Sequence, residues 1–555
     1  MPLSAMSSAA MPSGPGGAGA SRQPALIQGV GAAAGLTTRP TTARWLAPPP
    51  PLPQLGLETT ASPPEAPGTG PSAAVASAAE VSSGGELQSW LVLLDPSLRQ
   101  LLRHWLNLPL VQERSFARQL LDSWAGQQLL RQLGGLLTTS RGQPTTRLLQ
   151  ESVTRLLGRG QVVTPLALLV DLPPQRLRLN LDGATAMASQ WRRQVALQQH
   201  ALERLQRLSL PTARVKPLAF SDPIGVQPLR RTLRVAHRNE PLPLEIWPAA
   251  PGRGQSRPPW LLLMPGLGGT ADQLGWLAGD LAGRGWPAVV LQHPGSDAVA
   301  VKAALDGDRP PPGAETLAAR LADAQAVLVA QRRGELSVQG QGVVLIGHSL
   351  GGLTALLLAG LPPEPGLARR CEQPLQGLPL TNPSRLLQCQ LASIGVPTPA
   401  APPPDLRGVV VFNGFGSQLW PERGVAPLML PLLLVGGSLD VVTPPVQEQL
   451  RLFQGPADPR SRLVLVEGGS HFSPVRLRGQ GDALFRFDQT LVGLDPVQVQ
   501  TVLVRLTTEF LQTLDPGGSN ALLLPPQRRL QQGVTTFILD APRAGRWQGG
   551  LPRDP

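Results

Sequence analysis

Near the middle of this chain of 555 residues stands Val343-Val-Leu-Ile-Gly-His-Ser-Leu-Gly-Gly352. It begins with an apolar run typical of a buried strand, and the helix-forming residues 353–359 follow it. Between them lies Gly347-x-Ser349-x-Gly351, the pattern of a nucleophile elbow, in which a serine occupies a strained turn from strand to helix. Glycine is needed on both sides of that serine, because larger side chains would collide with neighbouring backbone. We therefore predict Ser349 as a nucleophile.

A serine hydroxyl is a weak nucleophile until a base removes its proton, so a histidine with a carboxylate partner is expected further along the chain. The one histidine after Ser349 is His471, in Gly468-Gly-Ser-His-Phe472. This segment directly follows the apolar run 463–466, which is the position expected for the base of such a site. We predict His471 as the general base.

The acid is predicted from Pro431-Leu-Leu-Leu-Val-Gly-Gly-Ser-Leu-Asp440, which gives a buried strand, a glycine turn and then a carboxylate. A carboxylate at the end of that strand can accept the Nδ1 proton of His471 and hold the ring. Asp405 is the nearest alternative, but it precedes its strand instead of following it. We predict Asp440 as the acid.

Main-chain N–H groups are expected to stabilise the oxyanion that forms when the serine attacks a carbonyl group. One is the amide of Leu350, at the N-terminus of the helix after the serine. The other is the amide of Leu267, in the glycine-rich loop Pro265-Gly-Leu-Gly-Gly269, where Gly266 is expected to border the pocket. The alternative for this loop is a simple glycine turn.

Two further histidines are candidates for the pocket. His348 is predicted to pack beside the elbow, and His293 either lines the pocket or caps a turn. The 6 histidines are dispersed and no carboxylate cluster accompanies them, so we predict no metal. Cys371 and Cys389 either form a disulfide in an oxidising compartment or are two unrelated small residues in a reducing one.

The net charge of +12 raises the question of nucleic-acid binding. Lys216 and Lys302 are the only lysines, so nearly all the positive charge is arginine, and it is scattered along helices instead of clustered. No nucleic-acid motif is present, and we predict no nucleic-acid partner. No apolar run approaches the roughly 18 residues that would span a bilayer, so no integral membrane segment is expected. The N-terminus has no clear export signal, which leaves cytoplasmic and exported locations both open.

The chain divides by composition and periodicity. Residues 1–85 are rich in Ala, Gly, Pro and Ser and are predicted to be a disordered tail. Helical periodicity over 86–210 predicts a small all-helical domain. From 216 to 535, short apolar runs alternate with helical stretches, which predicts a mostly parallel α/β sheet flanked by helices. Residues 361–407 form an insertion in this domain, and 536–555 are expected to be a C-terminal tail.

These motifs together resemble those of α/β-hydrolases of the dienelactone hydrolase and platelet-activating-factor acetylhydrolase type. The segments that carry the resemblance are Gly347-His-Ser-Leu-Gly-Gly352, Gly437-Ser-Leu-Asp440-Val-Val-Thr-Pro444 and Gly468-Gly-Ser-His471. The leading region, with Leu94-Asp-Pro-Ser-Leu-Arg-Gln-Leu-Leu102 and Arg178-Leu-Asn-Leu-Asp182, resembles a helical domain of unknown function that precedes such hydrolases in photosynthetic bacteria.

The resemblance covers roughly residues 86–535 and implies an α/β-hydrolase fold. It also implies hydrolysis of a carboxylic ester, either a small molecule or a lipid, with no cofactor. The cysteine-bearing insertion resembles one found in these proteins and would form part of a lid over the site. The alternative is a non-catalytic binding or scaffold protein on the same fold, and the sequence predicts no oligomeric state.

Overall fold

The computed structural model describes residues 80–81, 114–172, 177–216, 218, 227–250, 258–372, 382–398, 401–476, 493–514 and 524–551. All of them lie within one compact unit, Pro51–Pro555. The predicted tail lies outside the described residues except for Glu80–Val81, and so do residues 86–113 of the predicted all-helical domain.

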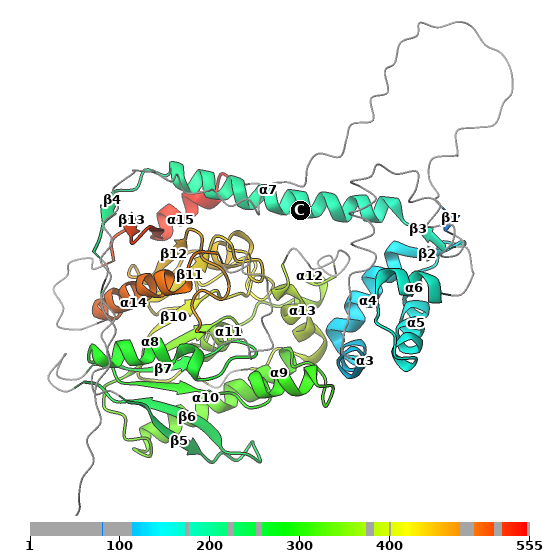
Figure 1. The fold of residues 1–555 in the computed structure, drawn as a ribbon. Coiled ribbons are helices and arrows are strands. Elements are labelled where there is room, and N and C mark those ends of the chain that lie inside the picture. Colours follow the sequence, from blue (N-terminus) through cyan, green and yellow to red (C-terminus); the bar gives the residue numbers. More distant parts are fainter. Residues whose placement is uncertain are drawn as a thin grey trace, which may run out of the picture. The chain divides into compact units, whose positions relative to one another are not determined.

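An eleven-stranded sheet forms the centre of the described structure, in the order β4-β13-β14-β12-β11-β10-β9-β7-β8-β6-β5 (Figure 1). The six strands from β12 to β8 in this order run parallel, whereas β14 and β6 pair antiparallel at the two ends of that block. The strands are β4 (Thr212–Arg214), β5 (Leu229–Leu233), β6 (Leu242–Trp247), β7 (Trp260–Met264), β8 (Ala288–Leu291), β9 (Val343–His348), β10 (Leu406–Phe412), β11 (Leu432–Gly437), β12 (Arg462–Val466), β13 (Gln527–Gln531) and β14 (Val534–Leu539).

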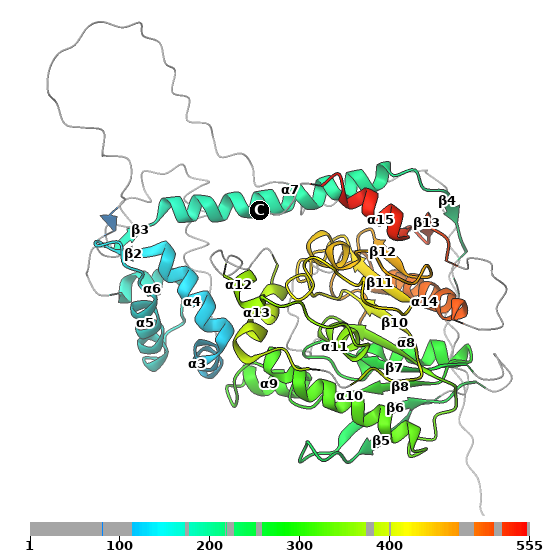
Figure 2. The ribbon, with the colours of Figure 1, turned by 180° about the vertical axis from the view of Figure 1, so that it is seen from behind.

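Helices cover both faces of this sheet, because its central strands are apolar on both sides. In β9, Val343 and Leu345 enter one buried cluster and Val344 and Ile346 enter the other, as the two-residue period of a strand requires. The first cluster is completed by α10 (Leu317–Arg332) and α11 (Leu350–Leu358), and the second by α8 (Asp272–Gly283) and α14 (Pro496–Thr513) (Figures 1 and 2). The predicted α/β fold with a mostly parallel sheet is confirmed.

The C-terminal residues differ from their prediction as a tail. β14 pairs with β12, and it is followed by α15 (Ala541–Gln548). The indole of Trp547 in α15 is buried and donates a hydrogen bond to the Ala201 carbonyl at 2.8 Å. Residues 536–551 are therefore part of the fold. Two threonines interrupt β14, Val534-Thr-Thr-Phe-Ile-Leu539, so it lacks the unbroken apolar run that marked the central strands.

The sequence predicted an all-helical leading region, but the structure also places short strands in it. The short strands β3 (Leu177–Leu179) and β2 (Leu137–Thr139) of this region form an antiparallel sheet with β1 (Glu80–Val81), which lies in the stretch predicted as a disordered tail. Strands of two or three residues are too short to show an alternating pattern, which is why the sequence did not reveal them. The helices are α3 (Arg114–Asp122), α4 (Trp124–Leu136), α5 (Thr146–Gly158), α6 (Pro165–Asp171) and α7 (Leu181–Arg207).

Helix α7 connects the leading region to the large sheet. It begins where the Asn180 side chain accepts a hydrogen bond from the Gly183 amide, and its later residues Ala201 and Leu205 are completely buried in the main apolar cluster. Figures 1 and 2 both show α15 alongside it. The second half of α7 thus packs with the α/β sheet, although the predicted boundary near residue 210 assigned it to the helical domain. No helix within the described ranges is long and apolar enough to cross a membrane.

Candidate active site

Ser349 occupies the turn between β9 and α11 with a strained backbone, φ 52° and ψ −118°. A Cβ atom added to Gly347 would lie 2.2 Å from the Gly351 carbonyl oxygen, and one added to Gly351 would lie 2.0 Å from the Met264 carbonyl oxygen. Both distances are far below a van der Waals contact. Glycine is therefore required at both positions for the turn that exposes the serine at the end of β9.

Three predicted residues meet at the carboxyl ends of β9, β11 and β12. The Ser349 hydroxyl lies 3.1 Å from His471 Nε2, and His471 Nδ1 lies 2.9 Å from Asp440 Oδ2. All three side chains are buried. The hydroxyl, the imidazole and the carboxylate therefore form one hydrogen-bonded chain, although their catalytic roles remain a prediction.

The Asp440 carboxylate is held by more groups than His471 alone. Its Oδ2 accepts from Asn413 Nδ2 and from Thr443 Oγ1, each at 2.6 Å, and its Oδ1 accepts from the amides of Val442 and Thr443 at 2.9 and 2.7 Å. Burial acts to raise the pKa of Asp440. The charge of His471 and the hydrogen bonds from His471 and Thr443 outweigh this and bring the pKa below its ordinary value, so the group is ionised at neutral pH.

Asn413 and Thr443 were not predicted as site residues. Asn413 is a non-glycine residue with a positive φ of 49°, directly after β10, and Thr443 follows Asp440 by three positions. The only sequence signal was position, since both residues follow apolar strands at the edge where the site forms. Their orientation toward the carboxylate depends on the packing of neighbouring strands.

The two predicted oxyanion donors lie near the nucleophile. A Cβ atom at Gly266 would lie 3.1 Å from Ser349 Cβ, so the loop after β7 packs directly against the serine. Leu350 is the first residue of α11. Among the hydrogen bonds of the described residues, none uses the main-chain N–H of Leu267 or of Leu350 as donor. Their role as oxyanion donors stays a prediction.

His348 lies beside the elbow, where the sequence placed it. Its Nε2 donates to the His471 carbonyl oxygen at 2.9 Å, and the centres of the two rings are 5.0 Å apart. Burial, together with the charge of His471, lowers the pKa of His348 to about 3. The ring is thus neutral at physiological pH and supports the backbone that carries His471.

His293 is part of a different buried cluster. Its Nδ1 lies 2.9 Å from Asp323 Oδ2, and its carbonyl oxygen accepts from the amide of Ser296 in the turn after β8. Asp323 also accepts hydrogen bonds from Arg238 and His237. These contacts agree with the prediction that His293 caps a turn. None of them involves Ser349 or His471. Burial, with the charge of Arg320, lowers the pKa of His293 to about 3.

The two neutral, buried histidines predict a loss of stability in mild acid. An unfolded histidine titrates near pH 6.5, whereas His293 and His348 titrate near 3 in the folded protein, so below pH 6.5 the unfolded state binds more protons. The stabilising contribution of these two neutral histidines is fully present above pH 6.5. Below it, stability falls by roughly 1.4 kcal/mol per pH unit for each histidine. The measurement is the free energy of urea unfolding at pH 7.5, 6.5 and 5.5.

Replacing His293 by glutamine should remove about half of this pH dependence. His200 is exposed, so His200→Gln serves as the matched control and should leave the dependence unchanged. An unfolding free energy that stays constant from pH 7.5 to 5.5 would contradict the prediction.

The insertion is attached to the site by a buried carboxylate. Glu448, in the short π-helix Val446–Leu450, accepts from Asn382 Nδ2 at 2.6 Å, and also from Ser384 and Gln388 of α13 (Ser384–Ile394). Its second oxygen accepts from the amides of residues 416 and 417 after β10. The Ser384 amide also donates to the Val442 carbonyl oxygen at 3.1 Å, so the first residue of α13 contacts the turn two residues after Asp440.

Cys371 and Cys389 are joined by a disulfide in the structure, with a Cα–Cα distance of 5.4 Å. It joins the end of α12 (Leu367–Arg370) to α13. Helix α13 is also contacted by the leading region, because Trp124 Nε1 donates to Ser393 Oγ at 3.1 Å. The insertion is thus attached to the sheet domain through Glu448 and to the leading region through Trp124.

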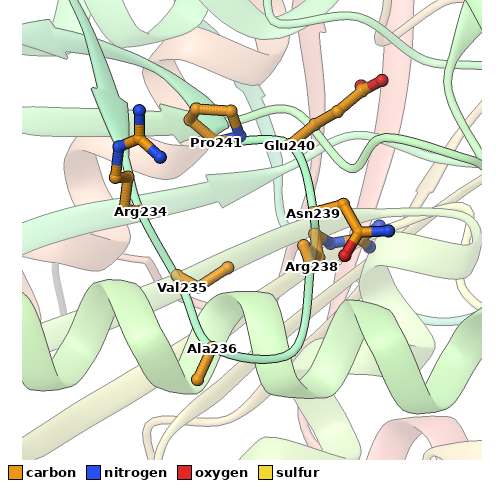
Figure 3. A pocket seen from close by; sticks show the side chains of 7 residues that line it. All are labelled: Arg234, Val235, Ala236, Arg238, Asn239, Glu240 and Pro241. Atoms are coloured by element: carbon orange, nitrogen blue, oxygen red, sulfur yellow. The ribbon is translucent and has the colours of Figure 1, made fainter.

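Two surface pockets lie away from this site. One, of about 330 Å³, is lined by the β5–β6 turn from Arg234 to Pro241 without His237 (Figure 3). The other, of about 460 Å³, runs from Leu229 on β5 to the loop around Ser337. Neither is lined by Ser349, Asp440 or His471. Within the described ranges, no group of His, Cys, Asp or Glu side chains could hold a metal ion.

The chain has the α/β fold that the sequence predicted, and part of it is similar to a family of α/β hydrolases. Residues 75–180 match a family described as "Alpha/beta hydrolase of unknown function (DUF1400)". This stretch overlaps the leading region and precedes the strands of the large sheet. The match and the fold support hydrolase activity without identifying a substrate.

No curated protein matches the chain. Among solved structures, a puromycin-hydrolyzing peptidase of Mycobacterium tuberculosis is similar over 57% of this chain and 42% of that chain, with 16% sequence identity and a TM-score of 0.30. The chain thus spans less than half the length of that peptidase.

Proposed function

We propose that this protein is a serine hydrolase that cleaves a carboxylic ester through an acyl-enzyme on Ser349. The observation that carries the proposal is the continuous chain of hydrogen bonds from the Ser349 hydroxyl through His471 to Asp440. It lies at a strained elbow whose glycines have no room for a side chain. Strain of this kind is kept where a function requires it.

In the proposed reaction, Ser349 Oγ attacks the acyl carbon while His471 Nε2 takes the hydroxyl proton. The carbonyl oxygen becomes an oxyanion, which accepts hydrogen bonds from the Leu267 and Leu350 amides. When the tetrahedral intermediate collapses, the bond to the leaving alcohol breaks and His471 returns the proton to that alcohol. Water then attacks the acyl-enzyme by the same route and releases the acid.

Asp440 would act through His471 and not on the substrate. As an ionised acceptor it keeps the proton of His471 on Nδ1, so that Nε2 carries a lone pair directed at Ser349. It also stabilises the imidazolium that forms during attack. Asn413 and Thr443 would keep the carboxylate in place during both steps.

The preference for esters rests on the resemblance of the three motifs to the dienelactone hydrolase and platelet-activating-factor acetylhydrolase type. The small exposed fraction of Ser349, 7%, agrees with a site that is covered, and the proposed cover is the insertion, whose helix α13 begins next to the Asp440 turn. Substrate size would then be set by the insertion and not by the elbow.

A fluorophosphonate probe tests the proposed nucleophile. Such a probe phosphonylates an activated serine, and mass spectrometry of the digested protein should find the adduct on the peptide that contains Ser349. Heat-denatured protein is the control and should not react, because the hydroxyl is activated only beside His471. Folded protein that stays unlabelled, or labelling at another serine, would contradict the proposal and favour a binding protein on a hydrolase fold.

A substrate panel tests the proposed ester preference separately. p-Nitrophenyl esters of increasing acyl length should be hydrolysed, and the matching p-nitroanilides should react much more slowly. Equal turnover of both series would reject ester specificity while leaving the serine hydrolase proposal intact.

A further inference from the structure

The loop that would supply the Leu267 amide needs an external support. Three of the five residues in Pro265-Gly-Leu-Gly-Gly269 are glycine, and glycine has the greatest backbone freedom. An oxyanion donor contributes most when its direction is set before the reaction, since reorganisation during attack would cost free energy. Contacts from outside the loop must therefore hold its peptide groups.

Arg320 of α10 provides such contacts. Arg320 is 1% exposed, and its Nη2 donates to the Pro265 carbonyl oxygen at the start of the loop. Nη1 donates to Ser296 Oγ at 2.8 Å. The Ser296 carbonyl oxygen in turn accepts from the Gly268 amide at 2.7 Å. Arg320 therefore holds the loop directly at its first residue and, through Ser296, at its fourth.

These anchors determine the direction of the Leu267 N–H group. The Gly269 amide donates to the Gly266 carbonyl oxygen at 3.2 Å, which turns this carbonyl into the loop. In a trans peptide the C=O and the following N–H point in opposite directions, so the Leu267 N–H points out of the loop. With residues 265 and 268 anchored, this peptide plane cannot rotate freely.

The loop and the nucleophile elbow are also in direct contact. A Cβ atom at Gly351 would lie 2.7 Å from the Pro265 carbonyl oxygen, the same atom that accepts from Arg320. A shift of this carbonyl would therefore displace both the loop and the elbow.

A buried guanidinium group is costly to desolvate, which argues for a specific role. Burial lowers the pKa of Arg320 to about 9, and the charge of Asp323 opposes that change, so the group stays charged at neutral pH. Asp323 lies three residues further along α10 and is fixed by Arg238 and His293. The cluster that contains His293 thus compensates the charge that holds the loop.

We infer that Arg320 is a positioning residue for the oxyanion site, with Ser296 as its relay to the Gly268 amide. The inference rests on the proposed function, because it concerns the Leu267 donor of the same reaction. Arg320 itself would not touch the substrate.

The test compares Arg320→Met with Arg462→Met. Arg462 is a suitable control because its side chain is also almost fully buried, 3% exposed, and donates to the Leu524 carbonyl oxygen from the start of β12. Both variants lose a buried guanidinium group, and only the first touches the loop. We expect Arg320→Met to lower kcat for a p-nitrophenyl ester by about 10- to 100-fold with KM nearly unchanged, somewhat less than the loss of a donor itself. Arg462→Met should keep the wild-type kcat when it is folded.

A second readout separates positioning from stability. A trifluoromethyl ketone adds to an activated serine and forms an oxyanion, so its affinity should fall in Arg320→Met by the same factor as kcat/KM. Arg320→Lys keeps the charge with fewer directed donors and should give an intermediate loss. If Arg320→Met does not fold, Ser296→Ala removes the relay hydroxyl with a smaller change, and a loss of about 3- to 10-fold in both readouts is expected.

Folded variants of Arg320 or Ser296 that keep wild-type kcat and ketone affinity would overturn the inference, and so would an equal loss in Arg462→Met. Labelling of wild-type protein by the fluorophosphonate distinguishes this outcome from failure of the proposed function. If the wild type is labelled at Ser349 and the variants are unaffected, only the role of Arg320 is wrong.

Discussion

Replacement of Ser349 by alanine is expected to lower kcat for ester hydrolysis by about 10⁴-fold or more, the largest effect in this protein. The change removes only the hydroxyl that lies 3.1 Å from His471 Nε2. Alanine keeps the Cβ atom and the same strained backbone, so the fold should change little. The measurement is kcat for a short p-nitrophenyl ester with wild type and variant at equal folded concentration.

Thermal unfolding of both proteins provides the control for this experiment. A variant with wild-type stability and no turnover identifies the loss as chemical. Equal rates in the two folded proteins would remove Ser349 from the reaction and leave the scaffold alternative in its place.

Asp440→Asn is expected to lower kcat by about 10⁴-fold, because it changes the tautomer of the proposed base. The Val442 and Thr443 amides both donate to one oxygen of Asp440, so the oxygen of asparagine would remain there. Its NH₂ group would then face His471 Nδ1, which must become an acceptor. The ring proton moves to Nε2, and this atom can no longer take the proton of Ser349.

Asp405→Asn is the matched control, since Asp405 was the alternative acid in the sequence. It should leave kcat unchanged. A normal rate in folded Asp440→Asn, or a large loss in Asp405→Asn, would show that the acid has been assigned to the wrong residue. A pH–rate profile adds a further check, because the variant should not regain full activity at high pH.

The strongest local patterns gave the clearest predictions. The apolar run 463–466 lies in β12 (Arg462–Val466), and the helix-forming residues 353–359 fall almost entirely within α11 (Leu350–Leu358). Both are strongly apolar. The edge elements were missed for the opposite reason, as β13, β14 and α15 are amphipathic or short and acquire their structure by packing against β12 and α7.

Local sequence patterns identified the elbow and the order of serine, acid and histidine, whereas packing determined the residues that support them. The elbow could be recognised because its glycines are a local steric requirement, and the order of serine, acid and histidine follows from the order of the strands. The supporting residues could not be recognised in this way. Asn413, Thr443, Arg320 and Glu448 are polar residues without a local motif, and each acts on partners distant in the chain or fixed by a turn.

The amino-acid sequence alone determined the α/β class of the fold, the elbow at Ser349 and the candidates His471 and Asp440, since each depends on short-range sterics or on the period of apolar residues. Only the tertiary structure decided which side chains surround them. Hydrogen bonds between distant segments depend on strand order and on the packing of the insertion, and these arise from burial summed over the whole chain. The anchoring of the loop by Arg320 and the attachment of α13 by Glu448 belong to this second group.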